Sequence, residues 1–453
     1  PVLGKGFSGG SNTYVRRYDI DPKVYPGDLV GQVHADGEII AGAWWDLYLN
    51  LNNDMEYMMD LFTESQEALS MRPDGFEGGL YRDILIDALM VDDNDGNLAN
   101  GTPNDNAILS AFAKHGITLL ANATILHSEV LVPETEMVPI TLETDVLVDY
   151  PAYLDSVFCY YRTDRSQPYV KVAMTSSGGN KFEAPIPAQP KGTIIDYYFT
   201  LKDTYGSMTG AEPFLADNAN PNLPFQMLVG YGVREKEDFD NTFGAWEVDP
   251  DMTDDATTGN WIFHTPDHTY SDPSTQVFIV QPDTDQTTEG IQSDICAVTG
   301  NANFQSGMGV NDVDDGQTTI QSPVFDVSEF DDPVFEYWRW YVNNPPGGAN
   351  PGNDTWKVLI SNNGTTWVDV ERTDVADNSW RRNIIKVKDH VTPSATVSLR
   401  FIASDSLIPG ANLNGGSIVE AAVDDLYLYD LGQVSSVDEV SNDITVYPNP
   451  ASD

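Results

Sequence analysis

Basic residues are scarce in this sequence. Its 453 residues include 23 Lys and Arg against 70 Asp and Glu, which gives a formal net charge of −47. A charge of this size excludes general affinity for nucleic acid phosphates or for anionic membranes, because both repel an acidic surface. Such acidity is typical of a solvated surface on a secreted or salt-exposed protein. It is also compatible with calcium binding by clustered carboxylates.

Cysteines and long apolar runs are also few. The two cysteines, Cys159 and Cys296, lie far apart in the sequence and do not form the close pairs of a disulfide scaffold. Neither their spacing nor a nearby histidine suggests a catalytic thiol. No apolar run approaches the ~20 residues that a membrane-spanning helix needs. Stability therefore has to come from burial, with bound metal as a further source.

The length and the changing texture of the chain predict several domains. A chain of 453 residues is too long for one ordinary core. Residues 1–130 read as helical with long loops, and residues 131–232 read as an immunoglobulin-like or fibronectin type III-like β-sandwich. Residues 233–432 read as a jelly-roll β-sandwich, and residues 433–453 as a polar linker with the start of a further segment.

Apolar spacing predicts helices in the first of these segments. From Val33 to Leu51 apolar residues recur at helical intervals, and a second helix fits Gly79 to Leu89. A third helix is expected to begin at Thr102, which is placed as an N-cap before Pro103, and to end at Gly116.

Short alternating runs predict strands in the later segments. The expected strands are Val157 to Arg162, Ile194 to Thr200, Trp356 to Ser361, Val397 to Ala403 and Val423 to Leu428. The third of these begins a hairpin that turns at Asn363-Gly364. Trp338 and Trp340 alternate onto one face, which favours burial in a sandwich over a sugar-stacking platform.

One run carries a family resemblance. The run Val33-His34-Ala35-Asp36-Gly37-Glu38-Ile39-Ile40-Ala41-Gly42, with Asn100-Gly101-Thr102-Pro103 and Ala113 to Ile117, resembles the C-terminal lobe of fungalysin-like, thermolysin-type secreted zinc metallopeptidases. In that family two histidines of H-E-x-x-H and a downstream carboxylate hold zinc. The resemblance implies that His34 hydrogen-bonds the oxyanion of the tetrahedral intermediate. It also implies that Glu38, one turn later, orients the His34 ring.

The sequence contains no H-E-x-x-H, so the zinc ligands are absent and the chain is inactive as it stands. It begins at Pro1 without an initiator Met or a signal peptide, and we expect the C-terminal portion of a larger secreted protein, cut short at both ends. The predicted fold class is multidomain, with the α-helical C-terminal lobe of a peptidase followed by all-β modules, first an Ig/FnIII-like sandwich and then a jelly-roll sandwich.

Two functions follow from this resemblance. The first is the C-terminal part of a secreted zinc metalloendopeptidase with accessory adhesion modules, which would bind zinc only if the missing N-terminal half is present. Its substrate would be a protein or a peptide. The alternative is a non-catalytic extracellular surface protein, an adhesin or a filament-forming protein, that retains a peptidase-like lobe.

An acidic loop before the third predicted helix is a calcium candidate. Its oxygen-bearing residues are Asp92, Asp93, Asp95 and Asn97. The loop fails as an EF-hand, because Val91 and Thr102 stand where the first and twelfth ligands are needed. A solvated acidic turn near a helix N-terminus explains the same residues equally well.

A second group of acids lies in the predicted jelly roll. Its members are Asp312, Asp314, Asp315, Asp424 and Asp425. Paired acids near the ends of adjacent strands repel each other unless a cation or an arginine neutralises them. We therefore expect a structural calcium in this segment.

The end of the chain resembles a sorting signal. Residues 444–453, which include Val446-Tyr447-Pro448-Asn449-Pro450, resemble the opening strand of the C-terminal sorting domain that type IX secretion reads in Bacteroidota. Residues 314–323, 361–367 and 417–425 resemble jelly-roll modules, related to MAM-type domains, that follow secreted bacterial peptidases and adhesins. These resemblances imply an extracellular or cell-surface location. They also imply that the type IX secretion machinery is a partner, and that the chain binds a surface polymer or associates with itself.

Overall fold

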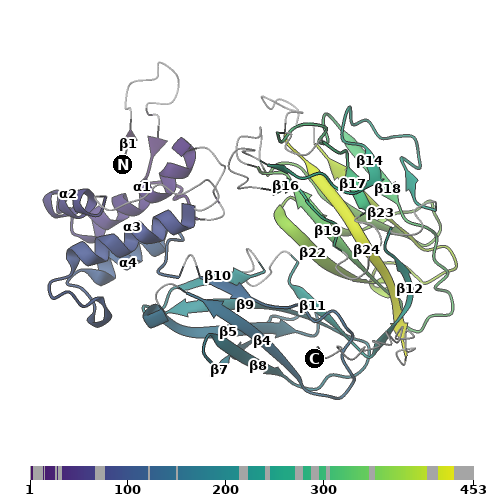
Figure 1. Ribbon diagram of the computed structural model, residues 1–453, viewed down its shortest axis with the longest axis horizontal. Helices are drawn as coiled ribbons and strands as arrows, with labels where there is room; N and C mark the ends of the chain where they lie inside the picture. The colour runs from purple at the N-terminus through teal and green to yellow at the C-terminus, as the bar shows by residue number, and fades with distance from the viewer. Residues whose placement is uncertain are drawn as a thin grey trace, which may run out of the picture.

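The computed structural model shows three regions that follow one another along the chain (Figure 1). It describes residues 2–3, 14, 16–25, 28, 33–66, 77–120, 123–148, 151–213, 223–239, 245–270, 279–286, 295–302, 307–345, 352–405 and 417–432. We name the regions the helical region (residues 33–120), the first sandwich (residues 124–229) and the second sandwich (residues 231–432). The domain boundaries expected from the sequence stay a prediction.

The helical region forms where apolar residues recur with helical spacing. Its elements are β1 (Val2–Leu3), β2 (Arg16–Arg17), α1 (Val33–Asn50), α2 (Met55–Glu64), α3 (Glu77–Asp92), the 3-10 turn η1 (Leu98–Asn100) and α4 (Asp105–Ala113). Trp44 of α1 packs edge-on against Phe62 of α2 and Phe112 of α4, with ring centroids 5.2 and 5.4 Å away. The predicted helices at α1 and α3 are confirmed, and α2 was not predicted. No helix among the described residues is long and apolar enough to cross a membrane.

The start of α4 differs from the prediction. The helix begins at Asp105, its N-cap residue is Asn104, and the Asn104 side chain makes no capping hydrogen bond. Thr102 instead donates its hydroxyl to the Asp92 carboxylate at 2.5 Å, and the backbone N–H of Asn104 donates to the same carboxylate at 2.6 Å. A carboxylate from α3 thus satisfies polar groups at the start of α4, which local sequence does not reveal.

The first sandwich consists of two antiparallel sheets. One has the strand order β3-β4-β8-β7, and the other has the order β10-β9-β5-β6 with β11 also paired to β9. The elements are β3 (Thr124–Leu126), β4 (Ile140–Leu147), η2 (Pro151–Tyr153), β5 (Leu154–Arg162), β6 (Val170–Ala173), β7 (Thr175–Gly178), β8 (Lys181–Ile186), β9 (Thr193–Asp203), β10 (Met208–Glu212) and β11 (Phe225–Val229). Along β4 the side chains alternate, so that Leu142 and Val146 are buried while Glu143 is exposed.

The second sandwich also pairs two antiparallel sheets. Their orders are β14-β17-β24-β19-β22, with β12 also paired to β24, and β13-β18-β23-β20-β21, while β15 and β16 form a separate pair. The elements are β12 (Tyr231–Glu237), β13 (Glu247–Val248), β14 (Trp261–His264), β15 (Thr269–Tyr270), β16 (Ile279–Gln281), β17 (Cys296–Thr299), β18 (Gln317–Gln321), β19 (Val334–Val342), β20 (Trp356–Ser361), β21 (Val368–Thr373), β22 (Asp377–Lys386), η3 (Val387–Asp389), β23 (Ser398–Ser404) and β24 (Glu420–Leu431). The predicted hairpin is confirmed, because β20 and β21 pair on either side of its turn.

Trp338 and Trp340 are buried as predicted, with 7% and 5% of their surface exposed. They do not lie between the two sheets, where their neighbours Tyr337 and Tyr341 fill the core. The Trp340 indole donates to the carbonyl of Val280 at 2.8 Å, so the chain around β16 covers this ring. The outer face of the β19 sheet is therefore covered here.

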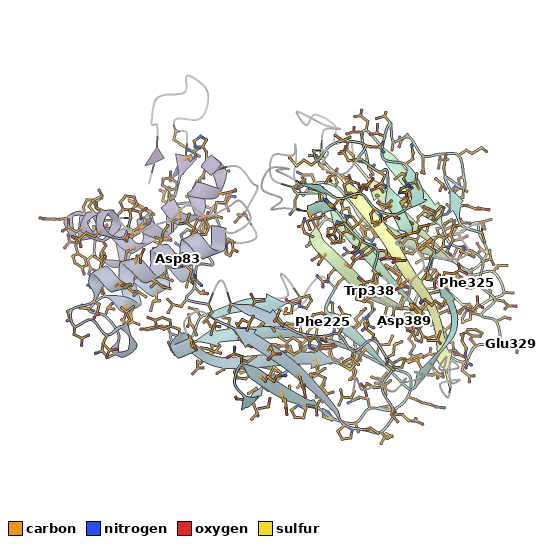
Figure 2. All side chains as sticks on the ribbon, viewed as in Figure 1. Asp83, Phe225, Phe325, Glu329, Trp338 and Asp389 are labelled. Carbon is orange, nitrogen blue, oxygen red and sulfur yellow. The ribbon has the colours of Figure 1, made fainter. Side chains whose placement is uncertain are left out.

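Polar side chains join the two sandwiches at the edge of β22. The backbone N–H of Ile384 donates to the Gln226 side chain at 2.7 Å, and the Ile384 carbonyl accepts from Arg165 at 3.2 Å. Figure 2 labels Phe225 in the first sandwich and Trp338 in the second, the two parts that this contact joins. Side chains of the first sandwich thus occupy backbone groups that an edge strand would otherwise leave open.

Buried charged side chains extend this contact between the two sandwiches. We call the whole contact the joint. Arg382, 3% exposed, lies 3.1 Å from the Glu129 carboxylate and 3.4 Å from the Glu336 carboxylate. An apolar cluster that includes Leu228 and Tyr429 packs beside them. The two sandwiches therefore share a contact made of buried charged and apolar side chains.

The fold class predicted from the sequence, an α-helical peptidase lobe followed by all-β modules, is wrong. Within the described residues the chain is mainly β, and its four α-helices are short and confined to residues 33–113. The four helices pack chiefly against one another, and their buried side chains connect with those of the first sandwich in one apolar cluster. The resemblance at Val33 to Gly42 misleads because a few helical turns do not reveal the larger unit to which a helix belongs.

Candidate functional site

The predicted catalytic pair lies at the start of α1. His34 is exposed, and Glu38 lies one turn later, where its Oε1 is 3.0 Å from Nε of Arg16. Among the described residues, no group of three or more His, Cys, Asp or Glu side chains could hold a metal ion. The predicted roles of His34 in binding the oxyanion and of Glu38 in orienting the His34 ring stay predictions.

The Asp92 carboxylate of the acidic loop is already occupied. It accepts hydrogen bonds from the hydroxyls of Tyr57 and Thr102, and from both the backbone and the side chain of Asn104. Burial raises the pKa of Asp92, but the bonds from Asn104 and Thr102 outweigh burial and hold this pKa below its ordinary value. Asp92 thus anchors the start of α4.

The other acids of this loop accept hydrogen bonds from residues close to them in the sequence. The Asp93 carboxylate accepts the backbone N–H of Asp95 at 3.3 Å, and Asp95 accepts that of Asn97 at 3.0 Å. These bonds fit the solvated-turn alternative. Calcium binding by the loop stays a prediction.

The acids of the second sandwich fall into two sets. The first joins Asp312, Asp314 and Asp315 to Asp405, which was not predicted. Burial, with Asp314 and Asp405 adding to it, raises the pKa of Asp312 to about 7. Asp405 is 1% exposed. One of its oxygens accepts from the Asp315 backbone at 2.9 Å, and the other has no hydrogen-bond partner among the described residues.

The second set centres on Asp424. Its carboxylate accepts from the backbone of Gln286 at 2.9 Å, and burial followed by the charge of Asp425 raises its pKa. Asp425 in turn lies 3.9 Å from Lys236. Glu420, which interacts with Asp312, lies four residues before Asp424 on β24, a distance of roughly 13 Å along a strand. The five predicted calcium ligands therefore do not converge on one site.

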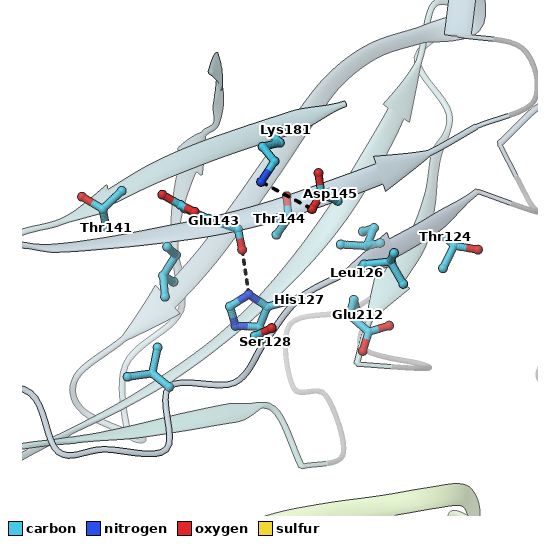
Figure 3. Close-up of a pocket in the computed structure, with 13 residues that line it drawn as sticks. Thr124, Leu126, His127, Ser128, Thr141, Glu143, Thr144, Asp145, Lys181 and Glu212 are labelled. Carbon is cyan, nitrogen blue, oxygen red and sulfur yellow. Dashed lines mark hydrogen bonds and ion pairs between the residues drawn. The ribbon is translucent and has the colours of Figure 1, made fainter. Parts of the chain in front are cut away.

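A groove on the first sandwich was not predicted (Figure 3). It has a volume of about 630 Å³, within the range of small-ligand sites. Its lining comes from β3 and the residues after it, from β4, and from the ends of β8 and β10. The side chains that carry polar groups include Thr124, His127, Ser128, Thr141, Glu143, Asp145, Lys181 and Glu212. Leu126, 51% exposed, adds an apolar surface.

The histidine of the groove has a structural role. Its Nδ1 lies 2.8 Å from the Glu143 carbonyl, which can only accept, so the proton sits on Nδ1. Nε2 then accepts from the Tyr197 hydroxyl at 2.9 Å. Burial lowers the pKa of His127 although the bond to Glu143 opposes this, which favours the neutral ring. Both ring nitrogens are thus engaged, and His127 offers no general base.

The other charged groups of the groove suit binding. Lys181 and Asp145 face each other at 4.0 Å (Figure 3). Burial raises the pKa of Glu212 to about 7, with Arg381 opposing this rise and Glu129 adding to it. Near neutral pH the Glu212 carboxyl can therefore donate as well as accept a hydrogen bond. The lining thus offers hydrogen-bonding groups around an apolar patch.

Part of this site was open to sequence reasoning. The run Ile140–Leu147 alternates strictly, which places Thr141, Glu143 and Asp145 together on the outer face of a strand. His127 and Glu212 come from other elements, and no local pattern links them to this face.

Comparison with known proteins gives only distant likenesses. No family model matches the chain, and no curated protein matches it. Solved structures that resemble part of it include the K1 cleaved adhesin domain of Lys-gingipain from Porphyromonas gingivalis W83 (13% identity, 44% of this chain and 98% of that chain, TM-score 0.27). Others are TmCBM61 in complex with beta-1,4-galactotriose (10%, 42% and 90%, TM-score 0.23) and a xylan-binding domain from CBM 22 (8%, 45% and 97%, TM-score 0.24). At TM-scores this low, these likenesses carry no argument about this chain.

Proposed function

We propose that the chain is a non-catalytic extracellular surface-binding protein of the adhesin type, and that the groove binds a neutral glycan. The observation that carries this proposal is the groove itself, in which carboxylates, hydroxyls and an ammonium surround an apolar patch while the histidine is locked in two hydrogen bonds. Such a lining is suited to recognising a ligand, and His127 is not placed to act as a general base.

The chemistry of the lining fits sugar hydroxyls. Glu143 and Asp145 accept hydrogen bonds from hydroxyls, and these charge-assisted bonds are stronger than neutral ones. Lys181 donates to ring or hydroxyl oxygens. Leu126 packs against the C–H groups of a pyranose. An extended ligand along β3 and β4 would meet all four side chains.

The joint between the sandwiches supports a role in attachment. Arg382 and its two carboxylates hold the first sandwich against β22. The groove is therefore presented at a fixed angle to the second sandwich, as a surface-binding protein requires. Export by the type IX machinery stays part of the proposal, because residues 444–453 lie outside the described residues.

Affinity electrophoresis of the purified chain in gels that contain neutral polysaccharides tests the groove. We expect retardation by at least one glycan, and a loss of about tenfold or more in affinity for Glu143→Ala with Asp145→Ala. Glu329→Gln, an exposed acid of the second sandwich (Figure 2), is the matched control and should bind normally. If no neutral glycan retards the chain, or if the double variant binds as tightly as the unsubstituted protein, the groove is not a glycan site.

Calcium binding in the second sandwich is a second proposal. Asp405 has a buried carboxylate oxygen without a partner among the described residues, and Asp312 and Asp314 interact with it. Because three acidic side chains do not form a complete site here, backbone carbonyls and water would supply the remaining ligands. Calcium should raise the melting temperature, and Asp405→Asn should abolish this rise while the exposed Asp369→Asn keeps it. An unchanged melting temperature in the unsubstituted protein would contradict the proposal.

A further inference from the structure

The outer face of the β10-β9-β5-β6 sheet carries a row of aromatic rings. Val157 and Cys159 of β5 are buried in the core, so Phe158 and Tyr160 point to the outer face. Tyr160 lies opposite Lys171 of β6 on one side and opposite Tyr198 of β9 on the other. Phe158 and Tyr160 are half-buried and Lys171 is exposed, so the β5 and β6 part of this face is accessible.

Cations lie on these rings at both ends of the row. Lys171 Nζ is 3.6 Å from the centroid of the Phe158 ring and 5.5 Å from that of Tyr160. Tyr160 and Tyr198 stack with centroids 4.7 Å apart and planes 5° from parallel. Beyond them the Arg162 guanidinium lies 4.4 Å from the Tyr169 ring. Cations over aromatic faces within about 6 Å are attracted by the ring quadrupole.

The charge of this face differs from that of the chain as a whole. The net charge of the protein is −47, but the face holds Arg162, Arg165, Lys171 and Lys202 against Asp155, Asp164 and Asp196. Asp196 is shared by Arg162 and Arg165 at 3.0 and 3.2 Å, and Lys202 pairs with Asp155 at 3.3 Å. Lys171 has no carboxylate within ion-pair distance among the described residues, so positive charge remains on the accessible side.

The same face has unused hydrogen-bonding groups. Thr200, opposite Phe158, is 3% exposed, and its hydroxyl has no partner in the described part of the chain. The Tyr169 hydroxyl is likewise without a partner there. Buried polar groups in folded proteins are generally hydrogen-bonded, so a partner outside the described residues has to complete these two hydroxyls.

We propose that this cation–aromatic face, formed by Phe158, Tyr160, Tyr169 and Lys171, binds an acidic polysaccharide. A sugar carboxylate pairs with Lys171, while the C–H face of a pyranose packs on Tyr160. The face lies on β5 and β6, whereas β3, β4 and β8 supply most of the groove, and it takes a ligand of different charge, so it does not depend on the groove being functional.

Binding of the full chain to polygalacturonate tests the proposal, with fully methyl-esterified polygalacturonate as the uncharged control ligand. We expect binding to the acid form that weakens as salt rises, and little binding to the ester. Lys171→Glu should lower affinity at least tenfold. Lys191→Glu, which makes the same charge change at an exposed lysine outside the face, should have little effect.

Tyr160→Leu separates sugar recognition from simple charge attraction. This variant keeps an apolar side chain, and its melting temperature reports whether it is folded. It should weaken polygalacturonate binding while leaving the weak attraction of polyglutamate unchanged. Equal losses in Lys171→Glu and Lys191→Glu would overturn the site. So would polyglutamate binding as tight as that of the sugar polymer. The groove variant Glu143→Ala with Asp145→Ala should keep polygalacturonate binding, which distinguishes failure of one site from failure of the other.

Discussion

The first sandwich meets its two neighbours through contacts of different chemistry. Toward the helices, one cluster of buried apolar residues runs without interruption from α1 to β11. Toward the second sandwich the two main cores stay separate, and the contact consists of a small apolar cluster with buried ion pairs around Arg382. A cleft of about 480 Å³ between α4 and the β9–β10 turn also opens on the helical side.

This difference separates stability from orientation. Apolar burial is non-directional and tolerates small shifts. The buried ion pairs of the joint are favourable in only one relative arrangement of the two sandwiches, because each buried charge needs its partner at short range. The helical contact therefore contributes mainly stability, and the joint mainly sets the angle between the sandwiches.

Removal of the Arg382 charge should have the largest effect on the free energy of unfolding. Arg382→Met leaves Glu129 and Glu336 buried without their counter-ion, and loss of one partner of a buried ion pair costs about 3–5 kcal/mol. Chemical denaturation should show this loss in the free energy of unfolding. The triple variant Arg382→Met, Glu129→Gln, Glu336→Gln should recover much of it. If Arg382→Met alone is as stable as the unsubstituted protein, the ion pairs do not hold the joint.

A cavity on the helical side should cost somewhat less. Leu120 lies between α4 and β3 in the sequence and is 2% exposed within the continuous cluster. Leu120→Ala should lower the free energy of unfolding by about 2–4 kcal/mol. The helices and the first sandwich should unfold together, which circular dichroism and tyrosine fluorescence would follow as one transition. Two separate transitions would mean that the cluster is not cooperative.

The joint should respond to pH, while the helical contact should not. Burial raises the pKa of Glu336 to about 7, with Arg382 opposing this rise and Glu129 adding to it. The pKa of Glu336 in the folded protein lies above its ordinary value. The contribution of Glu336 to the free energy of unfolding is therefore fully present below about pH 4.5 and is lost as pH rises through about 7. Other raised carboxyls titrate in this window, so the measurement is the difference between the unsubstituted protein and Glu336→Gln. That difference in the free energy of unfolding should change with pH. For Leu120→Ala, the free energy of unfolding should vary with pH as it does in the unsubstituted protein.

An exposed ion pair should matter least. Arg372 and Asp369 lie 2.8 Å apart on β21, but about half of each side chain is exposed. Solvent screening limits such pairs to about 1 kcal/mol or less, so Arg372→Met should barely shift the denaturation midpoint. A loss as large as that of Arg382→Met would show that burial does not decide the strength of ion pairs in this protein.

Local patterns predict single elements well and their assembly poorly. The helix at α1 and the β20–β21 hairpin follow from apolar spacing and an Asn-Gly turn. The joint does not follow from any such pattern, since 252 residues separate Arg382 from Val130, whose carbonyl it bonds at 3.0 Å. The peptidase-lobe error has the same origin, because the cluster that joins helices and sandwich depends on contacts distant in sequence.

The candidate site was predictable only in part. Alternation in β4 places Glu143 and Asp145 on one face, but the groove also needs Glu212, whose pKa depends on Arg381 of the second sandwich. The arrangement of the predicted calcium ligands also could not be read from the sequence. Asp312 and Asp424 look alike in the sequence, and the structure divides them between two sets with different neighbours.

The covered edge of β22 has a consequence for self-assembly. An open strand edge is a template on which another chain can add a strand, and this is a common route to aggregates and fibres. Here Gln226 and Arg165 occupy the N–H and carbonyl of Ile384, so an incoming strand would have to displace the first sandwich. At this position the contact that orients the two sandwiches therefore also closes a backbone template, so that strand addition here requires the two sandwiches to separate.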